Sequence, residues 1–432
     1  MRKYSAKIQN GWAFYDWANS VYPLVITSAI FPIFYEGLTT TEDNNTVSFF
    51  GREFINTSLI AYVSSASFLF ISLFLPLLSG IADYIGNKKR FLQFFCYLGA
   101  TSCMCLAFFS PDNLELSLVA FFMASVGFWS SLVFYNAYLP EIAPVSMHDK
   151  LSAKGYSLGY LGSSTLLIIC LAMVLSASNK EQAFMFMRIA FVLTGLWWIG
   201  FSQITYRRLP KTPKKGNETN VIFKGYHELK LVWKQLKNNL QLKRYLQAFF
   251  VYSMAVQTIM IMAVYFGAQE IEWPDKEASR GGLIASILLI QFIAILGAFL
   301  LSKFSALFGN IKALLVVVFL WICICVSALW VNTPTEFYLT AASVGLVMGG
   351  IQALSRSTYS KLLPKTKDTA SYFSFYDISE KIGIVIGTFS YGFIHQLTGS
   401  MRNSIFALIV FFVLGFILLL RVNKGKIRPS VK

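Results

Sequence analysis

Five ionisable side chains lie within long apolar runs of this sequence, where a charge is costly. Asp16 lies in the first run, Arg356 in the tenth, and Asp377, Glu380 and Lys381 in the eleventh. Charged residues inside membrane segments bind substrates, move protons or pair with one another. We therefore expect these five residues to form a site for substrate binding or ion coupling.

Asp16 and Arg356 each have two interpretations. Asp16, about one turn into the first run, could bind a substrate amine or a proton, or it could be a structural hydrogen-bond acceptor. Arg356 could hold a carboxylate or phosphate with its planar guanidinium, or it could pair with Asp377 or Glu380. We favour the pair for Arg356, and a pair that substrate breaks would combine both interpretations.

Asp377 and Lys381 are four residues apart, a spacing that brings their charges together on one face of a helix. Glu380 then faces elsewhere and is expected to lack that partner. A carboxylate without a partner in a low-dielectric bundle suits proton coupling, although a hydrogen bond to Arg356 would remove this property. Glu380 is therefore our first choice for a coupling site.

The elements that carry these residues are membrane helices. Hydrophobic residues make up 56% of the 432 residues and charged residues only 13%, with a mean hydropathy of +0.57. Twelve spans of about 20 residues account for roughly 240 positions. The spans are expected near residues 12–35, 57–82, 91–110, 115–138, 155–177, 184–206, 245–268, 280–302, 311–331, 336–360, 371–396 and 402–421.

The twelve runs divide into six and six around one long polar segment. We expect an N-terminal six-helix bundle over residues 1–206, a basic cytoplasmic linker over 207–244 and a C-terminal six-helix bundle over 245–432. In the linker, apolar side chains recur at steps of three and four, which predicts an amphipathic helix on the membrane surface. These side chains are Tyr226, Leu229, Trp233, Leu236 and Leu240.

A net charge of +16 could suggest nucleic acid, but the positions of the basic residues do not. Most of the 37 Lys and Arg lie at one set of span ends, which is the positive-inside pattern. Arg2 and Lys3 before the first span, and Lys424 and Arg428 after the last, place both termini in the cytoplasm. We expect a multi-pass protein of the cell inner membrane that binds no nucleic acid.

The turn between the second and third spans carries the most specific local motif. It combines Gly80, Asp83 and Gly86 with the basic residues Lys88, Lys89 and Arg90. Glycines allow a tight turn, a carboxylate can cap a neighbouring helix, and the basic cluster can bind the cytoplasmic leaflet. By spacing alone, a plain turn with positive-inside charges explains it equally well.

On this turn the sequence resembles the major facilitator superfamily, whose loop between helices two and three has the form G-x-x-x-D-x-x-G-[RK]-[RK]. The resemblance implies a cytoplasmic gate and a two-bundle fold with a central site. A second copy would follow the eighth span, where Gly309-Asn310-Ile-Lys312 echoes the ending of the first. Ala306 stands where Asp83 would, so we expect the charged gate to be stronger in the N-terminal half.

A narrower resemblance runs from the first span to the last. It is carried by the segments Trp12-Ala-Phe-Tyr-Asp16-Trp-Ala-Asn19-Ser20, Phe134-Tyr-Asn136-Ala-Tyr-Leu-Pro140-Glu141 and Gly349-Gly-Ile-Gln352-Ala-Leu-Ser-Arg356-Ser. They are similar to the bacterial "unknown major facilitator" group, which is related to the fungal autophagy-linked vacuolar amino-acid effluxers. Those relatives carry an acid on the seventh span where this chain has Met254, so a mechanism that needs acids on both first and seventh helices is in doubt here.

The resemblance also gives a role to four amides. Helices one, four, seven and ten line the central cavity in that superfamily, and here they carry Asn19, Asn136, Gln257 and Gln352. The resemblance implies hydrogen-bond donors around a midplane site, whereas polar contacts between helices are the alternative. Any one amide could be such a contact, but four in these positions favour a site.

The resulting expectation is a monomeric secondary transporter that moves a small polar metabolite by alternating access. The resemblance suggests amino-acid efflux, and proton coupling is a hypothesis. We expect no cofactor, no metal and no enzymatic activity, because His148, His227 and His395 form no acid–base cluster and no nucleotide-binding loop occurs. The alternatives are transport of a sugar, peptide or organic anion, or a non-transporting receptor or scaffold, against which the retained charges argue.

Overall fold

The computed structural model describes residues 5–40, 46–210 and 221–422. Several basic residues used to predict cytoplasmic termini, namely Arg2, Lys3, Lys424 and Arg428, lie outside the described residues. The described chain is helical except for a hairpin of β1 (Thr46–Phe49) and β2 (Arg52–Ile55), in which Thr46 faces Ile55.

The first group of helices extends from residue 6 to residue 208. Its long members are α3 (Asn56–Ile85), α4 (Lys88–Cys105), α5 (Leu114–Asn136), α7 (His148–Leu175) and α8 (Lys180–Arg208). The first span is composite and consists of α1 (Ala6–Asn19), the π-helical segment η1 (Tyr22–Ile30) and α2 (Phe31–Thr39). The short elements are η2 (Leu106–Phe108), η3 (Pro111–Asn113), α6 (Leu139–Ile142) and η4 (Val145–Met147).

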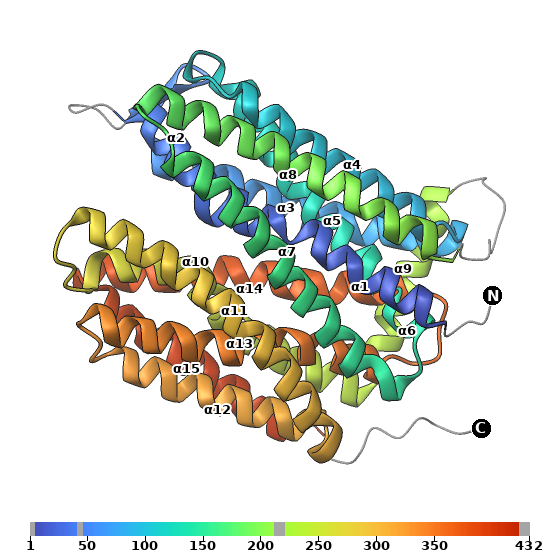
Figure 1. The fold of residues 1–432 in the computed structure, drawn as a ribbon. Helices are drawn as coiled ribbons and strands as arrows, with labels where there is room; N and C mark the ends of the chain where they lie inside the picture. The colour runs from blue at the N-terminus through green and yellow to red at the C-terminus, as the bar shows by residue number, and fades with distance from the viewer. Residues whose placement is uncertain (1–4, 41–45, 211–220, 423–432) are drawn as a thin grey trace.

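The second group follows α9 (Val221–Asn238). It comprises α10 (Leu240–Glu270), α11 (Lys276–Phe308), α12 (Asn310–Ala328), α13 (Pro334–Leu362), α14 (Thr369–Thr398) and α15 (Met401–Leu420). Figure 1 shows the blue-to-green first group beside the yellow-to-red second group. We call these groups the first and second bundles.

Among the described residues, eleven helical segments are long and apolar enough to cross a membrane. The 30-residue helix α14 is not one of them, and its middle carries Asp377, Glu380 and Lys381. The eleven segments and α14 together agree with the twelve predicted spans.

The two bundles meet through α3, α5 and α7 of the first and α11, α13 and α14 of the second. The start of α1, the end of α15 and the helix α9 belong to one end of the molecule (Figure 1). We call it the α9 end. Loops at that end connect α3 to α4, α5 to α7, α11 to α12 and α13 to α14.

The predicted linker helix is present as α9, and one of its faces packs on the protein. Gly225, Val232 and Leu236 are buried, because α9 packs against α3. Tyr226 and Trp233, expected on the apolar stripe that faces the membrane surface, are 57% and 44% exposed. Leu240, expected on the same helix, begins α10. The helix therefore lies on the protein along one face and leaves an apolar flank uncovered.

Contacts of α9 extend to both bundles. Tyr372 on α14 donates a hydrogen bond to the Gln235 side chain at 2.9 Å, and the Trp233 ring packs 5.2 Å from that of Phe375. On the other side, Gly80 of α3 directly contacts the Gly225 backbone, and a β-carbon on Gly80 would overlap the Gly225 carbonyl oxygen. The linker helix thus touches the first and second bundles at the α9 end.

Candidate functional site

A buried ion pair joins the two bundles at their interface. Both terminal nitrogens of Arg356 on α13 lie 3.2 Å from Oδ2 of Asp16 on α1. Their side chains are only 2% and 6% exposed. The helix begins at Ala6, so Asp16 lies about three turns into it rather than one.

The expected pair of Arg356 with Asp377 or Glu380 is therefore wrong for this structure. Helical periodicity along one chain does not determine which distant helix supplies the partner, and α1 lies closer to Arg356 than α14 does. Asp377 and Glu380 instead share Lys381.

The remaining donors of Arg356 are also used. Its Nε donates to the Ser152 hydroxyl at 2.9 Å, and a terminal nitrogen donates to the Ser152 carbonyl at 2.9 Å. The other terminal nitrogen donates to the Asn136 side-chain oxygen at 3.3 Å. Tyr135 donates to Asp16 at 2.8 Å. These hydrogen bonds offset much of the free-energy cost of burying the two charges.

An aromatic box surrounds the guanidinium. Its centre lies 4.1 Å from the Tyr156 ring centroid, 4.9 Å from that of Trp12 and 5.5 Å from that of Tyr135. Ring faces attract a cation, so the aromatic box stabilises the Arg356 charge in addition to the Asp16 carboxylate. Gly155 on α7 lies against the pair, and a β-carbon there would overlap an Asp16 oxygen. This glycine allows α7 to approach α1 and α13 closely.

Because Asp16, Tyr135 and Ser152 come from the first bundle and Arg356 from the second, separating the bundles here must break this network. Breaking it would expose an arginine and an aspartate of opposite charge. Such a pair can receive a ligand that carries both an anionic and a cationic group. We call these residues, with Trp12, Asn136 and Tyr156, the central site.

A second charged cluster lies on α14. Lys381 Nζ lies 3.1 Å from Oδ1 of Asp377, the pair that the four-residue spacing predicts, and 3.1 Å from Oε2 of Glu380. Gln257 on α10 donates to the other Glu380 oxygen at 2.6 Å. The expectation that Glu380 lacks a partner is therefore wrong, since the flexible lysine reaches both neighbours. We call Asp377, Glu380 and Lys381 the α14 triad.

The four amides do not gather around one point. Asn136 contacts Arg356, and Gln257 contacts Glu380. Gln352 accepts a hydrogen bond from Tyr160 of the first bundle at 2.5 Å. Asn19 is only 1% exposed, and its side-chain nitrogen has no hydrogen-bond partner in the structure. Their role as substrate ligands stays a prediction.

The turn motif forms a contact between the bundles at the α9 end. Asp83 accepts hydrogen bonds from the backbone N–H of Ser371 at 2.7 Å, from its hydroxyl at 2.8 Å and from the Ala370 N–H at 3.3 Å. These groups form the first turn of α14, where a carboxylate is stabilised by the helix dipole. Gly86, with a φ of 72°, ends α3 in the left-handed conformation that a glycine readily adopts.

Lys88 is part of the same contact instead of binding the leaflet. It is fully buried, pairs with Asp83 at 3.3 Å and with Glu141, and donates to the Thr369 hydroxyl at 2.6 Å. Lys89 donates to the Leu209 carbonyl at 3.2 Å, and only Arg90 is exposed. The expectation for the basic cluster was wrong at Lys88, because two carboxylates compensate its burial. We call Asp83, Lys88, Glu141, Thr369 and Ser371 the α14 gate.

A comparable contact joins α7 to the second bundle, also at the α9 end. The sequence analysis did not predict the residue that supplies its carboxylate. Asp149 at the start of α7 pairs with Lys361 at 2.5 Å. It accepts hydrogen bonds from Ser305 at 3.0 Å and Asn310 at 2.7 Å. We call these four residues the α11 gate. The α11 gate is charged although Ala306 replaces the acid, because Asp149 of the first bundle supplies the carboxylate. The expectation that the charged gate is stronger in the N-terminal half is therefore wrong.

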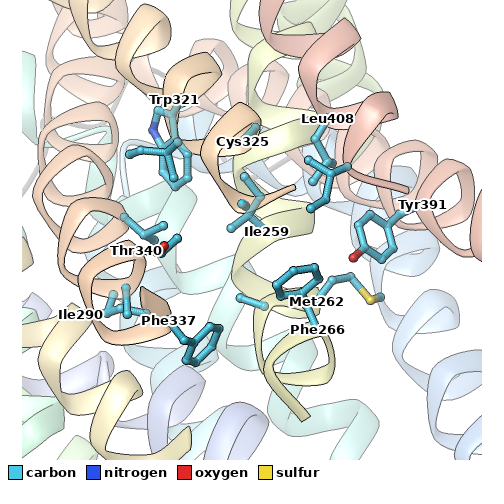
Figure 2. A pocket seen from close by; sticks show the side chains of 16 residues that line it. Ile259, Met262, Phe266, Ile290, Trp321, Cys325, Phe337, Thr340, Tyr391 and Leu408 are labelled. Atoms are coloured by element: carbon cyan, nitrogen blue, oxygen red, sulfur yellow. The ribbon is translucent and has the colours of Figure 1, made fainter. Parts of the chain in front are cut away.

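An apolar pocket lies within the second bundle and not between the bundles (Figure 2). Its lining includes Ile259, Phe266, Trp321 and Leu408. Of its polar residues, Thr340 donates to the Glu336 carbonyl. The Tyr391 hydroxyl likewise donates to the Met401 carbonyl. An apolar pocket with these hydroxyls in use does not suit a polar solute.

Several residues of these sites carried no recognisable signal in the sequence. Ser152 and Tyr156 are ordinary residues of their helix, and only the fold brings them to Arg356. Asp149 and Lys361 lie near span ends, where charges are common. Across the described residues, no group of three or more His, Cys, Asp or Glu side chains could hold a metal ion.

Comparisons with known proteins agree with this architecture. The model of the family described as "Vacuole effluxer Atg22 like" matches residues 4–148 and 143–431. The MFS-type transporter YxiO of Bacillus subtilis (strain 168) is 30% identical over 422 residues, covering 97% of this chain and 95% of YxiO. Autophagy-related protein 22 of Kluyveromyces lactis is 25% identical, covering 88% of this chain and 82% of that protein.

Solved structures share the fold at low sequence identity. The major facilitator transporter FucP in its outward conformation aligns with a TM-score of 0.71 at 14% identity, covering 98% of this chain and all of FucP. A bacterial homologue of ferroportin in an outward-facing state aligns with a TM-score of 0.66 at 9% identity, covering 96% of this chain and 98% of that one. These likenesses concern the fold alone.

Proposed function

Since this chain belongs to the Atg22-like effluxer family and has the fold of a major facilitator transporter, we propose that it exports amino acids across the cell inner membrane. It works by alternating access, with protons as the coupling ion and the α9 end in the cytoplasm. The observation that carries this proposal is the buried Asp16–Arg356 pair between the bundles.

The pair matches the two ends of an amino acid. Arg356 can bind the substrate carboxylate through two parallel hydrogen bonds, and Asp16 can bind the substrate ammonium. The Trp12 and Tyr156 rings, which already contact the guanidinium, provide apolar area beside the bound molecule. A zwitterion would therefore replace each charged partner with one of equal charge, so neither residue is left unpaired.

The same pair explains how export could finish. In the structure the α9 end is closed by both gates, and Asp16 and Arg356 bind each other. When the α9 end opens, the pair separates and substrate enters from the cytoplasm. When it closes again, Asp16 and Arg356 re-form their bond and displace the substrate toward the opposite end. Competition between substrate and the internal pair thus drives release.

The test is counterflow in proteoliposomes. Vesicles that contain wild-type protein and an unlabelled amino-acid pool are diluted into labelled pool, with and without an imposed pH gradient. We expect uptake of at least one member, a strong loss of uptake in Arg356→Lys and Asp16→Asn, and normal uptake in Arg188→Lys. Arg188 is a suitable control because it bonds the Ala107 carbonyl within the first bundle.

Lack of exchange by correctly folded wild type across the whole pool would refute the amino-acid proposal. Sugars, peptides and organic anions would then be assayed in the same vesicles. Normal uptake by both central-site variants would instead refute the assignment of the binding residues.

A further inference from the structure

The α14 triad carries two carboxylates but one ammonium, and most of it is buried. The Lys381 and Asp377 side chains are 0% and 7% exposed, and that of Glu380 is 18% exposed. Lys381 touches both acids, so it can balance only one negative charge. An unbalanced buried charge is costly, and it favours binding of a counter-charge.

The hydrogen bonds show which of the two acids has an oxygen without a hydrogen-bond partner. Glu380 uses one oxygen for Gln257 and the other for Lys381. Asp377 uses Oδ1 for Lys381, whereas its buried Oδ2 has no hydrogen-bond partner. Buried polar atoms are almost always satisfied, so an exception of this kind needs an explanation. Binding of a proton at Oδ2 provides one, because it removes a buried charge that no hydrogen bond stabilises.

Among the residues that the structure describes, Lys381 is the only positive charge that acts on Asp377. Trp129 of α5 covers Lys381, with its ring centroid 3.6 Å from the ammonium. The other titratable groups that interact with the triad are tyrosines, namely Tyr252 on α10, Tyr156 on α7 and Tyr376 on α14. Arg356 is already paired with Asp16. The excess charge of the triad is therefore not balanced by another element.

The site is suited to a proton and not to a metal ion. Sodium needs several oxygen ligands around one point, whereas here Lys381 occupies the space between the two acids. In the parts of the chain that are described, no acid-rich group is arranged for a metal ion. A proton needs only one lone pair, and Oδ2 of Asp377 supplies it.

From this geometry we infer that the α14 triad binds one proton and that Asp377, not Glu380, holds it. The inference rests on the proposed transport function only in giving that proton a coupling role. A hydronium ion gives its proton to Oδ2 and leaves as water, the Asp377 carboxylate becomes a carboxylic acid, and the triad changes from one net negative charge to none. Lys381 then stays paired with Glu380 of the second bundle and in contact with the Trp129 ring of the first bundle. Protonation of Asp377 therefore affects a contact between the two bundles.

Infrared difference spectroscopy tests the site without any substrate. Purified full-length protein is titrated from alkaline to acidic pH, and the carboxylic-acid C=O band is compared between variants. The other Asp and Glu side chains also contribute to this band, so we expect one component of it that is present in wild type and in Glu380→Gln and absent in Asp377→Asn. A component that persists in Asp377→Asn but disappears in Glu380→Gln would overturn the inference.

Transport supplies the second measurement. Counterflow needs no net proton movement, so the ratio of gradient-driven uptake to counterflow reports coupling. We expect Asp377→Asn to lower that ratio at least tenfold, and the exposed-loop control Asp275→Asn to leave it unchanged. An unchanged ratio in Asp377→Asn would refute the coupling role. If wild type moves no amino acid, the substrate proposal fails, while the infrared result still decides where the proton binds.

Discussion

At the scale of single residues, Arg356 and Asp16 are the two side chains whose environments depend most on each other. Each is almost fully buried, and each would be an uncompensated charge without the other. Removing one partner of a buried pair costs about 3–5 kcal/mol, whereas replacing both can cost little. The pair therefore predicts a particular pattern of stability.

We expect Asp16→Asn and Arg356→Gln each to lower the thermal unfolding midpoint of purified protein, and the double variant to recover more than half of the loss. The control is the pair Glu270–Arg402, which lies within the second bundle and is 18% and 21% exposed. Its double-mutant cycle should show weaker coupling, because partial hydration screens both charges. Additive effects at Asp16 and Arg356 would contradict the pairing.

Asp83 predicts a kinetic effect. Asparagine at this position keeps an oxygen that can accept from the first turn of α14 but loses the charge that pairs with Lys88. Lys88 retains Glu141, so folding should survive. We expect Asp83→Asn to be expressed normally and to turn over several-fold more slowly in counterflow. Wild-type turnover would show that the charge of the α14 gate has no mechanistic role.

At the scale of elements, α9 joins the two bundles at their closed end. It packs on α3 through a glycine–glycine contact, where Gly80 and Gly225 leave no room for a β-carbon. Its Gln235 and Trp233 side chains contact α14. A helix held on both bundles in this way favours the closed arrangement of the α9 end.

This packing predicts that Gly80→Val displaces α9 from α3. We expect trypsin to cleave at Lys230 and Lys234 several-fold faster in this variant than in wild type, because a displaced helix unfolds locally more often. Gly200→Val is the matched control, since a β-carbon at Gly200 meets open space. Equal cleavage in wild type and both variants would show that the contact does not hold α9.

At the scale of the whole molecule, the named contacts between the bundles concentrate toward the α9 end. The two gates and the central site all lie there, and Ser152 of α7 donates to the Ala353 carbonyl of α13 at 2.8 Å. Contacts concentrated at the α9 end are what the proposed exporter would show in its outward-facing state.

A disulfide between the bundles should lock this state. The Ala153 side chain of α7 packs with that of Ala353 of α13 across the interface, so we expect oxidation of Ala153→Cys/Ala353→Cys to abolish counterflow, and reduction to restore it. The control is Ser202→Cys, which lies beside the native Cys96 within the first bundle, with 3.5 Å between Sγ and Oγ. A cross-link there should leave transport intact, because rigid-body movement does not change distances inside a bundle. Transport that continues through the cross-linked pair would contradict alternating access.

The sequence alone was sufficient for the architecture. Twelve apolar runs, the basic residues at alternate span ends and the motif around Asp83 predict a two-bundle membrane transporter, because burial of apolar surface in lipid depends on local composition and length. Five charges inside spans were recognisable for the same reason, and the pair of Asp377 with Lys381 follows from helical periodicity.

Only the tertiary structure decided the partners. Arg356 pairs with Asp16 across 340 residues, Asp149 supplies the acid of the α11 gate, and Lys381 bridges two neighbours. Periodicity within one helix determines which residues share a face. Which other helix that face contacts depends on how the twelve helices pack. Charged side chains are long and can reach several partners, so burial and packing, not spacing, select among them.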